Sequence, residues 1–242
     1  MFPYVIDFIA GLGIGFIAGL LGVGGGFLIV PTLVLMGESI HVAIGTSLAC
    51  ITISSLASAY THLRRGAVLF RVVLVKEAFS IPAAFLGAYL SSLLPEAILR
   101  TVFAVLLVYL AYSLLKKGNG ADGPTAVNYR RVPLVGFLAG LMSGLLGISG
   151  GILNVPLFHT YVGIPMRYAI GTSSLALFFT ALAGAIAHYR LGQVDLHTAF
   201  LLAPGIILGA HLGAISAHRT RPATLRRVFA LLLVAVAIRM VL

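Results

Sequence analysis

The chain has 242 residues and a net charge of +10, with 60% hydrophobic and only 9% charged residues. Soluble domains usually carry about 25% charged residues, so a surface this poor in charge excludes a conventional water-soluble domain and indicates a membrane protein. The positive charge does not indicate nucleic-acid binding, because Lys and Arg stand in short clusters at the ends of apolar runs, as on the cytoplasmic flanks of membrane helices. These clusters are Arg64-Arg65, Lys116-Lys117, Arg130-Arg131, Arg219 with Arg221, and Arg226-Arg227.

The N-terminal apolar segment lacks the positive start of a cleavable signal peptide. The first Lys or Arg is Arg64, and the only charge near the N-terminus is Asp7. We therefore expect this segment to remain in a multi-pass protein of the inner cell membrane. The single cysteine, Cys50, excludes an intrachain disulfide and is interpreted as a small packing residue.

The apolar segments form two groups of four, separated by the polar, turn-rich stretch 117–131. In each group the first segment is interrupted by glycines, and the other three reach the roughly 20 apolar residues that span a bilayer. The first group covers roughly 5–36 with a break at Gly22 to Gly26, then 42–62, 69–93 and 97–115. The second group covers roughly 133–162 with a break at Gly147 to Gly151, then 168–189, 196–217 and 223–241.

The two groups share sequence blocks in the same order. Residues 19–31 read GLLGVGGGFLIVP and residues 144–156 read GLLGISGGILNVP, at an offset of 125. Further blocks recur at an offset of 126, and they begin at Ala43 and Ala169, at His62 and His188, and at Leu99 and Leu225. This pattern indicates an internal duplication. We predict an all-α polytopic membrane protein with a first repeat over 1–116, a linker over 117–131 and a second repeat over 132–242.

The distribution of Lys and Arg distinguishes two topologies. If each interrupted segment crosses the membrane, the chain has eight spans and places 10 of its 16 basic residues on the cytoplasmic side. If each interrupted segment is re-entrant, each repeat has three full spans, the repeats are inverted, and 13 of the 16 basic residues are cytoplasmic. The positive-inside rule favours the inverted arrangement.

The glycine breaks are the predicted centre of function. Glycine clusters are poor helix formers, and free backbone groups in a membrane must be buried in protein or face a wet cavity. Helices that restart near Phe27 and Ile152 would direct unpaired N–H groups and positive dipole ends into the breaks, which suits an anion. Matched breaks in two repeats are typical of a transporter's central site. The alternative is close helix packing, which we prefer for Gly11, Gly15 and Gly19.

Hydroxyl groups follow each break at matched positions. Thr46 and Ser47 begin the second segment of the first repeat, and Thr172 and Ser173 begin that of the second. These hydroxyls either bind an anion or its water, or cap the helix and bond to its own carbonyls. Both interpretations remain open.

Asn154 lies just past the second break, where the first repeat has Ile29. An amide buried in a membrane helix needs a hydrogen-bond partner. Asn154 is therefore predicted to contact the ligand from one repeat only.

Three histidines are candidates for a gate or a proton-sensitive group. His62 and His188 end their segments beside Arg64 and Arg190, where an interfacial polar role is the alternative. His211 lies deeper, inside 196–217, where ionisable groups are functional candidates. Asp7, Glu77 and Asp195 lie near segment ends and are interpreted as partners for nearby bases. We find no carboxylate and no base at the centre of a span.

Motifs of enzymes are missing from the sequence. GLLGVGGG lacks the Lys and the hydroxyl of a phosphate-binding loop, and no His and Glu have the spacing of a zinc site. Ser149 stands among glycines, but no histidine is placed to activate it. We expect no catalytic residue, no cofactor and no metal, and therefore no enzyme.

The paired breaks, each followed by an apolar run to a proline (Pro31 and Pro156), then AIGTS and His-x-Arg-x-Gly, resemble the sulfite exporter TauE/SafE family of membrane permeases. The resemblance covers almost the whole chain and implies transport of a small sulfur-containing anion such as sulfite or an organosulfonate. It implies a binding site made of Gly24, Gly25, Gly26, Thr46, Ser47, Gly150, Gly151, Asn154, Thr172 and Ser173. Ser149 replaces the glycine found at Gly24 of the first repeat, so the identity of the substrate stays open.

We therefore expect a carrier in the lipid bilayer that takes a small anionic solute and binds no nucleic acid. Its two broken helices would meet near the midplane, and its two units would rock to give alternating access at the repeat interface. Homo-oligomerisation, the direction of transport and the coupling ion stay open. Two rival functions remain: a transporter or channel for a cation or a neutral metabolite, and a non-transporting subunit of a membrane assembly.

Overall fold

The computed structural model describes residues 2–21, 26–115, 127–148, 151–217 and 222–241, and these residues form helices and connecting turns without any strand. The helices of the first part are α1 (Phe2–Leu21), α2 (Gly26–Leu35), α3 (Ile40–Arg64), α4 (Phe70–Leu93) and α5 (Glu96–Leu115). Those of the second part are η1 (Tyr129–Arg131), α6 (Val132–Leu146), α7 (Gly151–Pro156), the π-helix η2 (Leu157–Val162), α8 (Met166–Arg190), α9 (Leu196–Ala217) and α10 (Pro222–Val241). The predicted apolar segments agree with these bounds to within a few residues.

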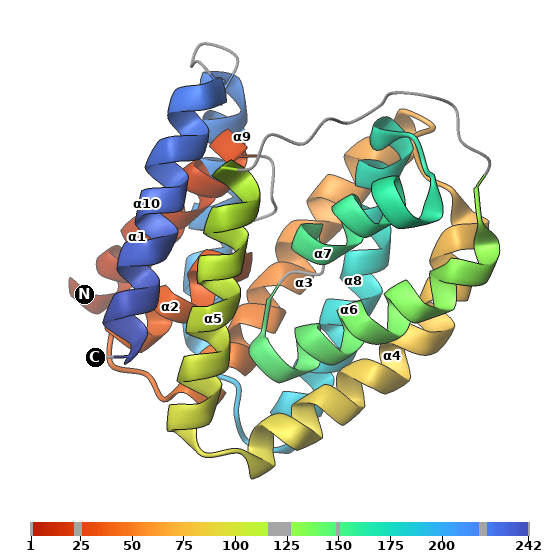
Figure 1. Ribbon diagram of the computed structural model, residues 1–242. Helices are drawn as coiled ribbons and strands as arrows, with labels where there is room; N and C mark the ends of the chain where they lie inside the picture. Colours follow the sequence, from red (N-terminus) through yellow and green to blue (C-terminus); the bar gives the residue numbers. More distant parts are fainter. Residues whose placement is uncertain (1, 22–25, 116–126, 149–150, 218–221, 242) are drawn as a thin grey trace.

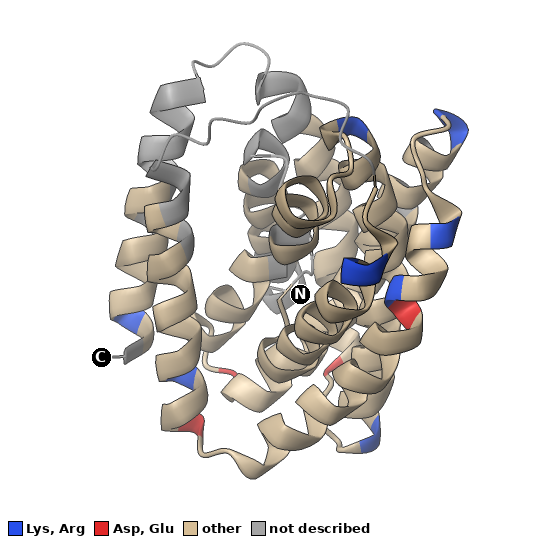
Figure 2. Cartoon of the chain, turned by 45° about the vertical axis from the view of Figure 1, so that its right-hand side comes forward, with Lys and Arg blue, Asp and Glu red and all other residues tan. Residues whose placement is uncertain are grey.

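Length and composition support a membrane location. Among the described residues, α3, α4 and α8 each combine the length and the apolar character of a membrane span, and shorter apolar helical stretches cover Phe8–Ile17 and Leu196–Leu212. Figure 2 shows how few charged residues the described ribbon carries and that most of them lie toward helix ends. The prediction of an all-helical, polytopic membrane protein is confirmed at this level, while the duplication stays a prediction from sequence.

The helices pair between the two parts of the sequence. Helix α1 packs against α9, α6 against α4, α3 against α8, and α5 against α10. In Figure 1, α1, α2, α5, α9 and α10 occupy one side of the molecule, and α4, α6, α7 and α8 occupy the other. Each side therefore mixes helices from before and after the predicted linker, so the two predicted repeats are interleaved in space.

Glycines permit the close approach of the paired helices. A Cβ added to Gly11 or Gly15 of α1 would lie 2.5 or 2.1 Å from the carbonyl oxygen of Leu202 or Ile206 on α9. On α6, Gly136, Gly140 and Gly144 meet the α4 backbone in the same way, at Lys76, Ser80 and Ala84. Small residues at such contacts let helix backbones approach closely in a membrane. The predicted packing role of Gly11 and Gly15 is confirmed.

A methyl group at one face of α1 should therefore destabilise the protein. We expect Gly15→Ala to cost about 1–3 kcal/mol, because the new Cβ forces α1 away from α9. Gly13→Ala, two residues earlier in the same helix, meets nothing within 4 Å and should leave stability unchanged. The midpoint of thermal aggregation of the detergent-solubilised protein measures both, and equal midpoints for the two variants would contradict the packing argument.

The turns after the broken segments report the topology. Gly37 and Gly163 lie at these turns with φ of 101° and 85°, and this backbone conformation disfavours any side chain at the two positions. Met36 and Met166 lie nearby and are exposed, so they are the better positions for a labelled cysteine. Single cysteines at Met36 and Met166, in a Cys50→Ala background, should react with an impermeant maleimide from opposite sides of the membrane if the repeats are inverted. Labelling of both from one side would support the eight-span arrangement instead.

Candidate functional site

The described helices stop and restart around each glycine cluster. Helix α1 ends at Leu21 and α2 begins at Gly26, and α6 ends at Leu146 and α7 begins at Gly151. The predicted site residues Gly24, Gly25 and Gly150 lie outside the described residues. Of the predicted glycines, the structure describes Gly26 and Gly151, each as the first residue of its helix.

Helix α3 packs directly on the end of α6. Gly147 caps α6 in a left-handed conformation with φ of 65°, and its N–H donates to the Ser143 carbonyl at 2.8 Å. The Ser47 hydroxyl donates to the Gly147 carbonyl at 2.8 Å, and a Cβ on Gly147 would lie 2.7 Å from the Ile44 carbonyl oxygen. Ser47 therefore binds the backbone at the beginning of the second break, across 100 residues of sequence.

The two threonines of the repeated AIGTS block bind loop backbone of the other repeat. The Thr46 hydroxyl accepts the N–H of Asp195 at 2.9 Å, and the Thr172 hydroxyl accepts the N–H of Leu69 at 3.0 Å. Gly45 and Gly171 precede these threonines. A Cβ added to either glycine would lie 2.1 Å from a carbonyl oxygen of the same loop, so the absence of a side chain permits this close approach. Each Gly-Thr pair thus forms a docking point for the loop before α9 or α4. This docking role of the Thr46 and Thr172 hydroxyls differs from both helix capping and hydrogen bonding to the carbonyls of their own helix.

Three buried polar side chains on α6, α7 and α8 have no hydrogen-bond partner among the described residues. They are the amide of Asn154 on α7, the hydroxyl of Ser173 on α8 and the hydroxyl of Ser143 on α6. Helix α7 packs against both α6 and α8. A polar group buried without a partner costs about 1–3 kcal/mol, so these groups are suited to bind a polar solute or its water.

The three predicted histidines lie in different environments. His188 is fully buried, and its Nε2–H donates to the Gly144 carbonyl at 2.8 Å while Nδ1 lies 2.8 Å from the Gln193 side chain. His62 is half-buried at the end of α3, and His211 is exposed on α9. His188 therefore ties the end of α8 to α6 near the second break, and a gating role for the histidines stays a prediction.

Asp195 and Glu77, interpreted from sequence as partners of nearby bases, differ in the structure. The Asp195 carboxylate accepts the N–H groups of His197 and Thr198 and so caps α9. Burial raises the pKa of Asp195, but the hydrogen bonds from Thr198 and His197 outweigh it and leave that pKa below its ordinary value. Glu77 does pair with a base, the adjacent Lys76, at 2.8 Å.

The burial of Lys76 was not predicted from the sequence, which indicates only that no base lies at the centre of a span. In the structure Lys76 is 0% exposed, in the seventh position of α4. The available signal was a Lys-Glu pair inside the apolar run 69–93, with Ser80 one helical turn further on. Within the described part of the chain, no three His, Cys, Asp or Glu side chains gather to hold a metal ion.

Comparison with known proteins gives a consistent result. The family model described as sulfite exporter TauE/SafE matches residues 7–240. A probable membrane transporter protein of Haemophilus influenzae is 31% identical over the full length of both chains. The probable membrane transporter protein YdhB of Bacillus subtilis is 31% identical over 83% of this chain and 85% of its own length. One from Xylella fastidiosa (strain Temecula1) is 32% identical over 93% of this chain and 90% of its own. No solved structure matches.

The docking role of the threonines predicts a stability defect. We expect Thr46→Val and Thr172→Val each to cost about 1–3 kcal/mol, because each leaves a loop N–H without its acceptor. Thr52→Val is the matched control, since the Thr52 hydroxyl bonds only the Leu48 carbonyl of its own helix. Thermal unfolding in detergent measures the stability of all three variants. Unchanged stability of both Thr46→Val and Thr172→Val would contradict the docking role and favour a role of these hydroxyls in ligand binding.

Proposed function

The chain belongs to the sulfite exporter TauE/SafE family of membrane transporters, and on this premise we propose that it carries a small sulfur-containing anion, such as sulfite or an organosulfonate, by alternating access. The observation that supports this most directly is the buried amide of Asn154. It lies three residues after Gly151, where the second break ends, is 0% exposed, and has no partner among the described residues. An amide in this state needs a polar ligand, and it can donate two hydrogen bonds to an anion.

Neutral donors would make up the rest of the anion site. The Ser173 hydroxyl is buried on α8, which packs against α7, and has no partner within the part of the chain that the structure describes. Helix α2 begins at Gly26, and the first N–H groups of a helix lack acceptors within it and carry the positive end of its dipole. Donors without formal charge bind an anion weakly enough to release it, as a carrier requires.

The interleaved fold suggests which bodies move. The sides seen in Figure 1 are joined through α3, which contacts α8 on one side and α2 and α9 on the other. The second break lies against Ile44 and Ser47 of α3, so it adjoins the boundary between the sides. We propose that alternating access consists of motion of one side against the other, with each side containing helices of both repeats.

A flux panel with one variant tests this proposal. Purified protein in phospholipid vesicles should show saturable uptake of ³⁵S-sulfite or labelled sulfoacetate, and no uptake of a monovalent cation. Asn154→Ile, which copies Ile29 of the first repeat, should reduce anion uptake at least tenfold and leave the protein folded, because Ile29 is itself fully buried in its helix. Leu153→Ile is the control in the same helix and should transport normally.

Each other outcome has a clear consequence. Saturable cation or neutral-solute uptake without anion uptake would establish a transporter of another class. No saturable uptake of any solute would favour a non-transporting assembly subunit. Normal anion uptake by folded Asn154→Ile would remove this amide from the site.

A further inference from the structure

A closed cluster of charged and hydroxyl side chains lies inside the α4–α6–α8 packing. Lys76 is 0% exposed and Glu77 is 6% exposed, and the Lys76 ammonium donates to the Glu77 carboxylate at 2.8 Å. The same ammonium donates to Ser80 at 3.0 Å and to Thr180 at 2.6 Å. An ammonium has three donors, and these three contacts would use all of them.

Thr180 connects this ion pair to the other part of the chain. It lies on α8, and its hydroxyl donates to the Glu77 carboxylate at 2.9 Å. The carbonyl of Ala176, in the same helix, is a second acceptor at 3.2 Å. The Ser80 oxygen lies 2.9 Å from the same hydroxyl, so Thr180 has possible acceptors both on α4 and in its own helix.

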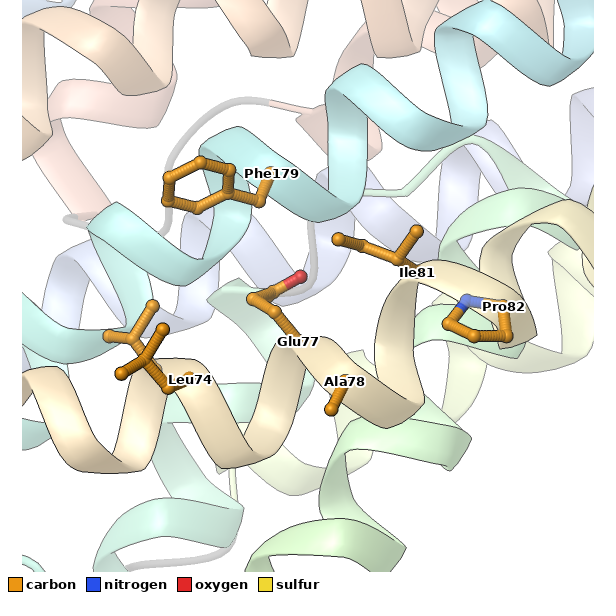
Figure 3. A pocket seen from close by; sticks show the side chains of 7 residues that line it. Leu74, Glu77, Ala78, Ile81, Pro82 and Phe179 are labelled. Carbon is orange, nitrogen blue, oxygen red and sulfur yellow. The ribbon is translucent and has the colours of Figure 1, made fainter.

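Glu77 borders a groove that opens on the outside of the helix bundle. The groove has a volume of about 470 Å³ and is lined by Val73, Leu74, Glu77, Ala78, Ile81, Pro82 and Phe179. Figure 3 shows the Glu77 carboxyl between α4 and Phe179 of α8, among apolar side chains. Its carboxyl is the only ionisable group in this lining, so a small apolar reagent dissolved in the lipid can reach it from the groove.

The fold does not require these charges. At an offset of 126, the positions of Lys76 and Ser80 correspond to Leu202 and Ile206 on α9, and Glu77 corresponds to Ala203. Glycines of α1 pack on the backbone of Leu202 and Ile206 just as glycines of α6 pack on Lys76 and Ser80.

The counterpart of Thr180 is Ser54, which bonds the Ile51 carbonyl of its own helix. Apolar residues thus serve the same packing, and a buried ion pair is seldom more stable than an apolar replacement. Helix packing alone therefore does not account for the cluster.

No other charge faces Glu77 among the described residues. Helix α6 carries no titratable side chain. The titratable residues of α8 lie toward its ends, at Arg167, Tyr168, His188, Tyr189 and Arg190. On α4 itself, Arg71 lies 5.0 Å from the ring of Tyr129, and Tyr89 is three turns away. Lys76 is thus the single charged partner of this carboxylate.

We propose that Glu77 is a proton-exchange site that couples proton movement to anion transport, with Lys76 as its fixed counter-charge. With Glu77 ionised, the cluster is neutral and Thr180 ties α8 to α4. When Glu77 takes up a proton, the Thr180 hydroxyl turns to the Ala176 carbonyl, so the bond between Thr180 and Glu77 is lost while Lys76 still donates to Thr180. The cluster then carries one positive charge, which favours an anion elsewhere in the low-dielectric bundle. A proton and an anion are thereby carried together; this second part rests on the proposed function.

Carbodiimide labelling tests the proton site without any substrate. Dicyclohexylcarbodiimide is apolar and modifies protonated carboxyl groups. We expect mass spectrometry of protein in phosphatidylcholine vesicles to find Glu77 labelled, with a yield that rises as the pH falls from 9 to 5. The partly exposed Glu96, which pairs with Arg100 at 3.3 Å, is the internal reference for the reagent's own pH dependence. Glu77→Gln should abolish the adduct at this position, and Lys76→Met should move the midpoint of labelling at least one pH unit upward.

The controls separate a functional failure from a folding failure. The double variant Lys76→Leu/Glu77→Ala copies α9 and should fold, which shows that the cluster is dispensable for assembly. No adduct on Glu77 at any pH, or a labelling midpoint unchanged in folded Lys76→Met, would overturn the proton site.

Transport separates the two proposals. In the wild type, an inward proton gradient should accelerate sulfoacetate uptake at least fivefold, and Glu77→Gln should retain uptake but lose this acceleration. Labelling without any anion uptake would contradict the proposed function while supporting the proton site. Uptake with equal gradient dependence in both proteins would contradict the coupling alone.

Discussion

The fold depends on backbone-to-backbone contact between helices that are distant in sequence. Carbonyl oxygens of α9 and α4 lie where glycines of α1 and α6 leave room, at separations that no Cβ tolerates. Hydrocarbon gives no hydrophobic force that would draw apolar helices together. Close packing and the few hydrogen bonds between helices must therefore hold the bundle. The Gly-Thr docking points and the Ser47 bond to Gly147 are of this kind.

The same contacts explain how irregular backbone is tolerated. Gly147 leaves the helix with a left-handed conformation, and its carbonyl would be exposed if α3 did not supply Ser47. Non-helical backbone at membrane depth survives only where protein or a wet cavity satisfies it. The backbone of Gly147 is satisfied in this way, whereas the side chains of Asn154 and Ser173 have no partner among the described residues and could donate to a solute.

Sequence reasoning predicted the helices well because glycines, prolines and polar turns punctuate long apolar runs. It also assigned Gly11 and Gly15 to packing, since a spacing of four places them on one helix face. It did not find the docking role of Thr46 and Thr172, because their partners Asp195 and Leu69 are over 100 residues away and donate through backbone that any residue supplies. It did not predict the burial of Lys76, because position along a segment does not show which face of the helix is covered by protein. Burial of Lys76 follows instead from packing against α6 and α8, which one sequence does not reveal.

The exchanged helix pairing also has consequences for biosynthesis. Helix α6 follows α4 in the chain with α5 alone intervening among the long helices, so this pair can assemble as soon as α6 leaves the ribosome. Helix α1 is made first, yet its partner α9 is the penultimate helix. One side of the molecule therefore matures early, whereas α1 must wait in the bilayer, with its glycine face uncovered, until nearly the whole polypeptide has been translated. Quality control during insertion would then act mainly on α1, which makes the amino-terminal helix the vulnerable element while the protein is being made.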